Sequence, residues 1–156
     1  MKVAIIAPPY PLEEAPAPPL GVTYVAAAFE RAGADVRIFD YIVNRYTPEK
    51  LREELDRFKP DAVGATSVTL NFPVAAEILC TAKHHRPDIV TLMGGPHVSF
   101  WEKGTLDTYP GIDLVVCGEA EKTIPELMPC LEDRKGWENV RGIAFRSGND
   151  VVRTEP

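Results

Sequence analysis

Cysteine is scarce in this sequence, and clusters of basic residues are missing from it. The 156 residues include only Cys80, Cys117 and Cys130, an odd number at wide spacing. This spacing suggests neither a disulfide framework nor a zinc or iron–sulfur site, and we expect each cysteine to be a small buried side chain. The net charge of −6, without clustered Lys and Arg, argues against binding to a nucleic-acid backbone. A small molecule is the expected partner.

Long apolar runs are also absent. No run approaches the about 18 residues of a membrane-spanning helix, which argues against membrane insertion. The first seven residues carry one basic side chain and too short an apolar stretch for a signal peptide. The hydrophobic content of 45% is ordinary for a globular protein, and the length suits one main domain. The sequence therefore predicts a cytoplasmic protein that can fold alone.

Several catalytic and nucleotide-binding motifs are missing. There is no G-x-G-x-x-G after the first expected strand and no Walker A sequence, so dinucleotides and nucleoside triphosphates are poorly supported. Ser67 lacks the G-x-S-x-G context of a nucleophile elbow. For His97 two interpretations stay open: a ligand or acid–base group, and a turn histidine bonded to the backbone. A small flavodoxin-like enzyme that uses Ser67 and His97 remains one alternative function.

Strand and helix patterns alternate along the chain. We expect strands over residues 2–7, 35–40, 61–66, 89–93 and 112–117, helices over residues 21–31, 48–58, 73–85 and 118–131, and a short helix or irregular segment over residues 101–109. Residues 143–146 and 150–153 predict a C-terminal β-hairpin. This alternation predicts an α/β fold with a doubly wound, Rossmann- or flavodoxin-like, five-stranded parallel sheet. The favoured strand order, numbered along the chain, is 2-1-3-4-5.

In that order, the loops after strands one, three, four and five converge at one edge of the sheet, where ligands bind. The apolar run 89–93 stops abruptly at Gly94 and Gly95, and a turn without Cβ atoms lets a flat or bulky group lie against the backbone. The proline-dense segment 8–19 is either a functional loop or a stiff crossover. These loops predict a broad crevice for a large ligand.

Four segments at these strand ends carry a family resemblance. They are Pro18-Pro19-Leu20-Gly21, Gly64-Ala65-Thr66-Ser67, Gly94-Gly95-Pro96-His97 and Gly118-Glu119-Ala120-Glu121. Together they resemble the N-terminal cobalamin (B12)-binding domain of B12-dependent radical SAM proteins, over nearly the whole chain. The usual Gly-Glu-Gly-Glu pattern of that family is altered here at Ala120.

The resemblance implies cobalamin as the cofactor, bound base-off and His-off. In cobalamin domains of the methionine synthase and mutase type, a D-x-H-x-x-G loop supplies a histidine to cobalt, and this sequence has Pro8-Pro9-Tyr10-Pro11 instead. The resemblance further implies that the hydroxyls of residues 66–68 contact the dimethylbenzimidazole tail and that Gly94 and Gly95 leave room for it. The implied cofactor-binding residues are Pro9, Tyr10, Leu20, Gly21, Thr66, Ser67, Val68, Thr69, Leu70, Gly94, Gly95, Pro96, His97, Gly118, Glu119 and Ala120. No catalytic residue is implied.

The resemblance also predicts the domain organisation. Residues 1–138 would form the cobalamin domain, and residues 139–156 a terminal hairpin and the start of a linker to a radical SAM barrel. The C-x-x-x-C-x-x-C motif of such a barrel is absent, so we expect a truncated domain without the [4Fe-4S] cluster and S-adenosylmethionine site of its parent, a methylase or cyclase. A cofactor-free interaction domain is the other alternative.

Overall fold

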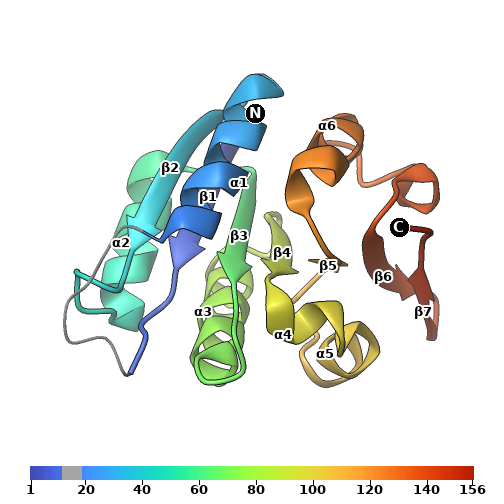
Figure 1. Ribbon diagram of the computed structural model, residues 1–156. Coiled ribbons are helices and arrows are strands. Elements are labelled where there is room, and N and C mark those ends of the chain that lie inside the picture. Colours follow the sequence, from blue (N-terminus) through green and yellow to red (C-terminus); the bar gives the residue numbers. More distant parts are fainter. Residues whose placement is uncertain (12–18) are drawn as a thin grey trace.

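The chain folds into a seven-stranded sheet with helices on both faces (Figure 1). The computed structural model describes residues 1–11 and 19–156. The strands are β1 (Lys2–Ala7), β2 (Asp35–Asp40), β3 (Ala62–Thr66), β4 (Val90–Gly94), β5 (Leu114–Val116), β6 (Ile143–Ser147) and β7 (Asp150–Arg153). The helices are α1 (Leu20–Arg31), α2 (Pro48–Phe58), α3 (Phe72–His85), α4 (Pro96–Ser99), α5 (Glu102–Thr108) and α6 (Ala120–Leu131), with a 3-10 helix at Trp137–Asn139. The prolines at 16 and 18, in the segment expected to be either a functional loop or a stiff crossover, lie outside the described residues.

The strand order is β2-β1-β3-β4-β5-β6-β7, and it confirms the predicted doubly wound sheet. The five strands from β2 to β5 pair in parallel. The predicted hairpin is present and continues the same sheet, since β6 pairs antiparallel with β5 and β7 with β6. The sheet is therefore mixed, with its antiparallel part at the end far from β2. The domain boundary at residue 138 stays a prediction.

Helix ends follow the expected capping chemistry. Thr47 accepts a hydrogen bond from the backbone N–H of Lys50 at 3.2 Å, and Pro48 occupies the first turn of α2. Gly33, which has a φ of 95°, follows the end of α1. One element was not expected. Directly after the glycine turn, Pro96 starts the short helix α4 at a position where its missing N–H is not needed.

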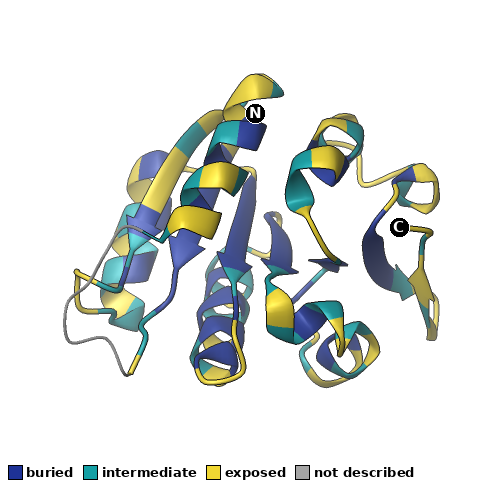
Figure 2. Cartoon of the chain, in the orientation of Figure 1, coloured by how far each residue is buried: buried dark blue, intermediate teal, exposed yellow. Residues whose placement is uncertain are grey.

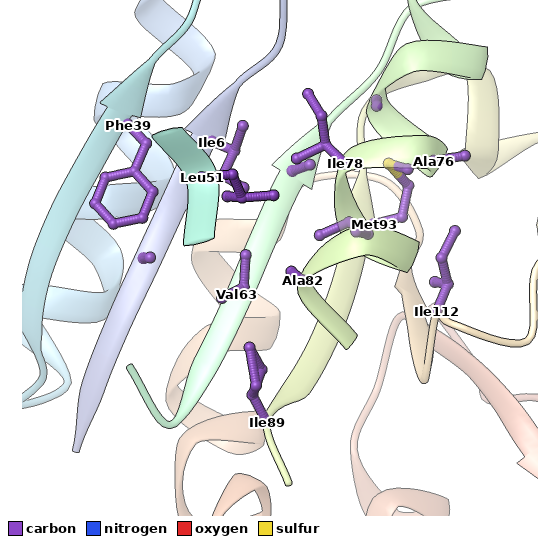
Figure 3. Packing of buried hydrophobic residues seen from close by; sticks show 14 of the residues in the cluster. Ile6, Phe39, Leu51, Val63, Ala76, Ile78, Ala82, Ile89, Met93 and Ile112 are labelled. Atoms are coloured by element: carbon purple, nitrogen blue, oxygen red, sulfur yellow. The ribbon is translucent and has the colours of Figure 1, made fainter. Parts of the chain in front are cut away.

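The two faces of the sheet have separate cores because side chains alternate along each strand. On one face, α1 and α6 pack on the strands; on the other, α2 and α3 pack on residues such as Ile6, Val63 and Met93 (Figure 3). The central strands are therefore buried on both sides (Figure 2). Because β1, β3, β4 and β5 run in one direction, their carboxyl ends meet at one edge, the lower edge in Figure 1, called here the carboxyl edge.

Arg146 on β6 fixes the segment between α5 and β5. Its guanidinium donates to the carbonyl oxygens of Leu106, Tyr109 and Ile112 at 2.6–3.1 Å. The carbonyls at Leu106 and Tyr109 come from the end of α5, where backbone acceptors lack helical partners. Arg146 thus links β6 of the hairpin to the segment that precedes β5, the last strand of the parallel part of the sheet.

Replacement of Arg146 by Met is expected to lower the free energy of unfolding by about 2–4 kcal/mol, because it leaves several partly buried carbonyls without donors. Urea denaturation measures this loss. Lys103→Met is the control, since Lys103 pairs with Asp107 on an exposed helix face and such pairs contribute little. Equal midpoints for Arg146→Met and the unchanged chain would contradict the expected role.

Candidate functional site

A cavity of about 490 Å³ lies between α1, α6 and the sheet, and it opens at the carboxyl edge. We call it the α1–α6 cavity. Its floor comes from β1, β3, β4 and β5, and its walls come from the facing sides of the two helices. The sheet order brings the carboxyl ends of β1, β3, β4 and β5 together. Residues from these strands, and from the loops and helices next to them, therefore meet at the cavity.

Two positions on the floor of the cavity, Gly64 and Gly94, carry no side chain. Ile5, Gly64 and Leu92 are neighbours in register across β1, β3 and β4, so the row dips at Gly64. One row nearer the carboxyl edge, Thr66 pairs with Gly94, and a Cβ atom on Gly94 would meet no atom within 4 Å. Glycine inside a strand often marks the close approach of another group. Here Gly94 opens a hollow above the sheet, whereas the space over Gly64 is partly taken by the Ile5 side chain, whose Cδ1 would lie 3.3 Å from an added Cβ atom.

Gly94 and Gly95 serve different purposes, although both were expected to make room for a ligand. Gly94 faces open space. Gly95 has a φ of 103°, and a Cβ atom on it would lie 2.7 Å from the backbone nitrogen of Ser67 and 2.9 Å from Oγ1 of Thr66. Gly95 is thus needed for the close contact between the turn and the loop after β3. Of the two glycines, only Gly94 fits the expected role of leaving room for a ligand.

Ser67 is fully buried and holds two loops together. Its backbone N–H donates to the Gly94 carbonyl at 2.9 Å, its hydroxyl donates to the same oxygen at 3.3 Å, and its own carbonyl accepts from the His97 N–H at 3.3 Å. The neighbouring Thr66 lines the cavity instead. Among the described residues, no hydrogen bond joins the Ser67 hydroxyl to the His97 ring. This geometry does not form a nucleophile–base pair.

The His97 ring is packed among aromatic side chains. Its centroid lies 4.2 Å from that of Phe72 and 5.7 Å from that of Trp101. Nδ1 lies 3.3 Å from Oγ1 of Thr69, while Nε2 is buried and has no hydrogen-bond partner among the residues described. The side chain is therefore not the backbone-bonded turn histidine that was one of its two interpretations.

The mouth of the cavity carries its polar side chains. Ser99, at the end of α4, donates through its hydroxyl to the Gly95 carbonyl at 3.1 Å and accepts from the Gly118 N–H at 3.0 Å. Glu119 and Glu121 stand at the start of α6, where negative charge suits the helix dipole. Phe100 is 90% exposed at the same place. The mouth thus combines oxygen atoms with one exposed aromatic ring.

A second cavity, of about 210 Å³, lies beside the end of β1. Tyr10, Pro19 and Ile42 contribute to its wall, and Thr66 lies between it and the α1–α6 cavity. The proline segment that follows β1 therefore contributes to a hollow through its described residues.

Ten of the sixteen predicted site residues line one of the two cavities, eight of them the α1–α6 cavity. Those lining the α1–α6 cavity are Gly21, Thr66, Gly94, Gly95, Pro96, Gly118, Glu119 and Ala120, and those lining the smaller cavity are Tyr10, Thr66 and Val68. The predicted residues that line neither are Pro9, Leu20, Ser67, Thr69, Leu70 and His97. Leu20 and Leu70 are 69% and 56% exposed at the carboxyl edge, so both are accessible to a ligand that extends out of the cavities.

Sequence reasoning missed the inner lining of the α1–α6 cavity. The missed residues include Ile5, Val22, Val25, Phe29, Gly64, Leu92, Val116 and Ile124. A glycine in the middle of an otherwise apolar strand was the available signal, because Gly64 interrupts a run that core packing alone would fill. The helix residues gave no such signal, since a helix face that lines a cavity has the same apolar spacing as one that packs on a core.

The described residues show neither a metal-binding cluster nor a membrane-spanning helix. No group of three His, Cys, Asp or Glu side chains is placed to hold a metal ion in residues 1–11 and 19–156. No helix in the same part of the chain is long and apolar enough to cross a bilayer. All three cysteines are free and only partly buried, so the expectation that each is a buried side chain was wrong. Partial burial raises the pKa of the Cys80 and Cys117 thiols, which keeps them protonated near neutral pH.

A family profile described as the B12 binding domain matches residues 14–128. The anaerobic magnesium-protoporphyrin IX monomethyl ester cyclase of Cereibacter sphaeroides is 33% identical over 141 residues, covering 88% of this chain and 23% of that protein. An uncharacterized methyltransferase of Pyrococcus horikoshii is 34% identical over 139 residues, covering 89% of this chain and 30% of that protein. The chain thus spans less than a third of either relative.

A solved structure shares the fold. The radical S-adenosylmethionine methyltransferase TsrM from Kitasatospora setae, with cobalamin and a [4Fe-4S] cluster bound, superimposes with a TM-score of 0.85 at 20% identity. The match covers 99% of this chain and 29% of that one.

Proposed function

This chain belongs to the B12-binding domain family, and from this premise we propose that it binds cobalamin with the nucleotide tail in the α1–α6 cavity. The observation that carries the proposal is the hollow over Gly94, where an added Cβ atom would meet no atom within 4 Å. A volume of about 490 Å³ lies within the range of small-molecule sites. An apolar interior with polar groups at the mouth suits a flat aromatic base joined to a ribose phosphate and a corrin ring.

The residues of the carboxyl edge would hold the parts of cobalamin that remain outside. Thr66 offers a hydroxyl at the mouth, and the exposed Leu70 and Phe100 offer apolar surface next to it. Bound cobalamin would supply a cobalt centre that carries a methyl group or an electron. The chain itself provides binding, orientation and a dry site for the tail.

We further propose that cobalt receives no histidine from this chain, the base-off and His-off mode. The loop after β1 has no histidine. His85 lies at the end of α3, at the opposite edge of the sheet, and its Nε2 lies 2.8 Å from Oδ1 of Asp56. His97 is at the carboxyl edge, but its ring is packed against Phe72. A base held in the cavity is also removed from cobalt.

The working partner of this module, in our proposal, is a radical SAM domain with S-adenosylmethionine and a [4Fe-4S] cluster. Relatives named as a cyclase and a methyltransferase are about three to four times longer than their match to this chain, so they have room for such a domain. The exposed apolar residues around the cavity mouth, among them Leu20 and Phe100, lie where a second domain would close over the corrin. A methylase or a cyclase reaction is the proposed use.

Titration of the purified chain with hydroxocobalamin, followed by gel filtration, tests the binding proposal. We expect equimolar co-elution and a base-off absorption spectrum. A folded chain, verified by circular dichroism, that elutes without any corrinoid would contradict the proposal and favour a cofactor-free interaction domain.

His97→Phe tests the His-off part separately. Phenylalanine preserves the stacking on Phe72 and removes both ring nitrogens. The expected absorption spectrum of the complex stays base-off, whatever happens to the affinity, because His97 does not coordinate cobalt in this proposal. A shift of the cobalt absorption bands between the unchanged chain and His97→Phe would show that His97 is a ligand.

A further inference from the structure

The α1–α6 cavity changes character with depth. Helices α1 and α6 both begin at the carboxyl edge and run away from it, so residues later in each helix lie deeper (Figure 1). Along α1, Val22, Val25 and Phe29 follow one another at successive turns, and each lines the cavity. On the floor, Ile5 and Leu92 lie one row deeper than Thr66 and Gly94. The inner half is thus lined by aliphatic and aromatic carbon.

Hydrogen-bonding side chains are confined to the mouth. The cavity-lining residues with polar side chains are Thr66, Ser99, Glu119 and Glu121, and each stands at the end of β3 or α4 or at the start of α6. In the interior, the backbone groups of β1, β3 and β4 pair with one another in the sheet. A group that reaches the level of Phe29 therefore meets no side-chain donor or acceptor among the described residues.

We propose that this cavity selects among cobamides by the lower base of their nucleotide tail, accepting dimethylbenzimidazole and discriminating against adenine. The inference rests on the proposed cobalamin function. The edge of dimethylbenzimidazole away from the ribose carries two methyl groups, which gain free energy when the apolar lining of the cavity, including Val25, removes them from water. The corresponding edge of adenine carries an amino group and a ring nitrogen. Burial of these groups without partners costs free energy, equivalent to about 10- to 100-fold in affinity.

Dissociation constants of three corrinoids test the selection: cobalamin, the adenine cobamide with the same corrin, and cobinamide, which has no nucleotide. We expect the adenine cobamide to bind at least about tenfold more weakly than cobalamin. Adenine is the weaker cobalt ligand and leaves cobalt more readily. This difference favours base-off binding of the adenine cobamide, so it opposes the expected order and cannot produce it.

The outcomes separate the two proposals. Binding of cobalamin and the adenine cobamide within about threefold would overturn the selection while leaving cobalamin binding intact. Failure of all three corrinoids to bind a folded chain would overturn the cobalamin proposal, and the selection with it. Tight cobalamin binding with weak binding of the adenine cobamide supports both.

Val25→Thr tests whether the wall of the cavity makes the selection. Threonine has nearly the shape of valine but adds a hydroxyl, which destabilises a protein when it is buried in a core. Val25 is only partly buried where it lines the cavity, so this cost is small at position 25. We expect the ratio of the two dissociation constants to fall by about threefold or more, because one hydrogen bond becomes available to adenine. A ratio equal to that of the unchanged chain would overturn the assignment of selection to this wall.

Discussion

Gly94→Trp is expected to abolish saturable cobalamin binding while leaving the fold intact. A Cβ atom on Gly94 points into open space, and the backbone there is compatible with any L-residue. An indole ring built from this position occupies the α1–α6 cavity beside Thr66 and Leu92, where the nucleotide tail is proposed to lie. Hydroxocobalamin titration measures binding, and circular dichroism together with urea denaturation measures the fold.

Glu53→Trp is the matched control for this variant. Glu53 is exposed on α2, on the opposite face of the sheet from α1, so a tryptophan there adds the same side chain without approaching the cavity. Cobalamin affinity is expected to equal that of the unchanged chain. Full binding by Gly94→Trp would place the tail elsewhere, and loss of binding in both variants would point to a general effect of the added tryptophan.

Gly95→Ala is expected to lower the free energy of unfolding by about 3 kcal/mol or more, although it adds only one methyl group. The φ of 103° is strained for any residue with a Cβ atom, and the added methyl would collide with backbone atoms of Ser67, which the loop cannot move aside cheaply. Thermal or urea unfolding measures the loss. The expected loss is large because backbone strain and the collision with Ser67 both act at position 95.

The adjacent Gly94→Ala variant provides the comparison. Alanine at position 94 meets no atom within 4 Å and lies in strand β4, so its unfolding free energy is expected to stay within about 1 kcal/mol of the unchanged chain. Similar losses in the two alanine variants would contradict the different roles assigned to the two glycines.

The order of strands and helices could be predicted from the sequence because local signals mark each element. Thr47 and Pro48 start α2, Gly33 follows α1, and each predicted strand lies within two residues of its observed bounds. The four-residue helix α4 was missed, since a single turn is too short to show a period. The convergence of four loops at one edge then followed from the sheet order alone.

The detailed roles inside the site could not be predicted, because they depend on contacts between distant residues. Ser67 was expected to face the ligand, yet it bonds to Gly94, which is 27 positions away in the sequence. The two adjacent glycines look alike in the sequence and differ only in their φ angles and neighbours. Val22 and Phe29 are core residues by their burial, and only the arrangement of α1 and α6 in space shows that they also border the cavity. Such features arise from the packing of helices on the sheet.

The electron paramagnetic resonance spectrum of cob(II)alamin bound to this chain tests the binding mode most directly. In free cob(II)alamin at neutral pH, the coordinated base nitrogen splits the cobalt lines. With the tail in the α1–α6 cavity and no histidine from the chain on cobalt, the bound spectrum is predicted to lose this nitrogen splitting. A bound spectrum that retains the splitting would show a nitrogen ligand on cobalt and would contradict the proposed mode.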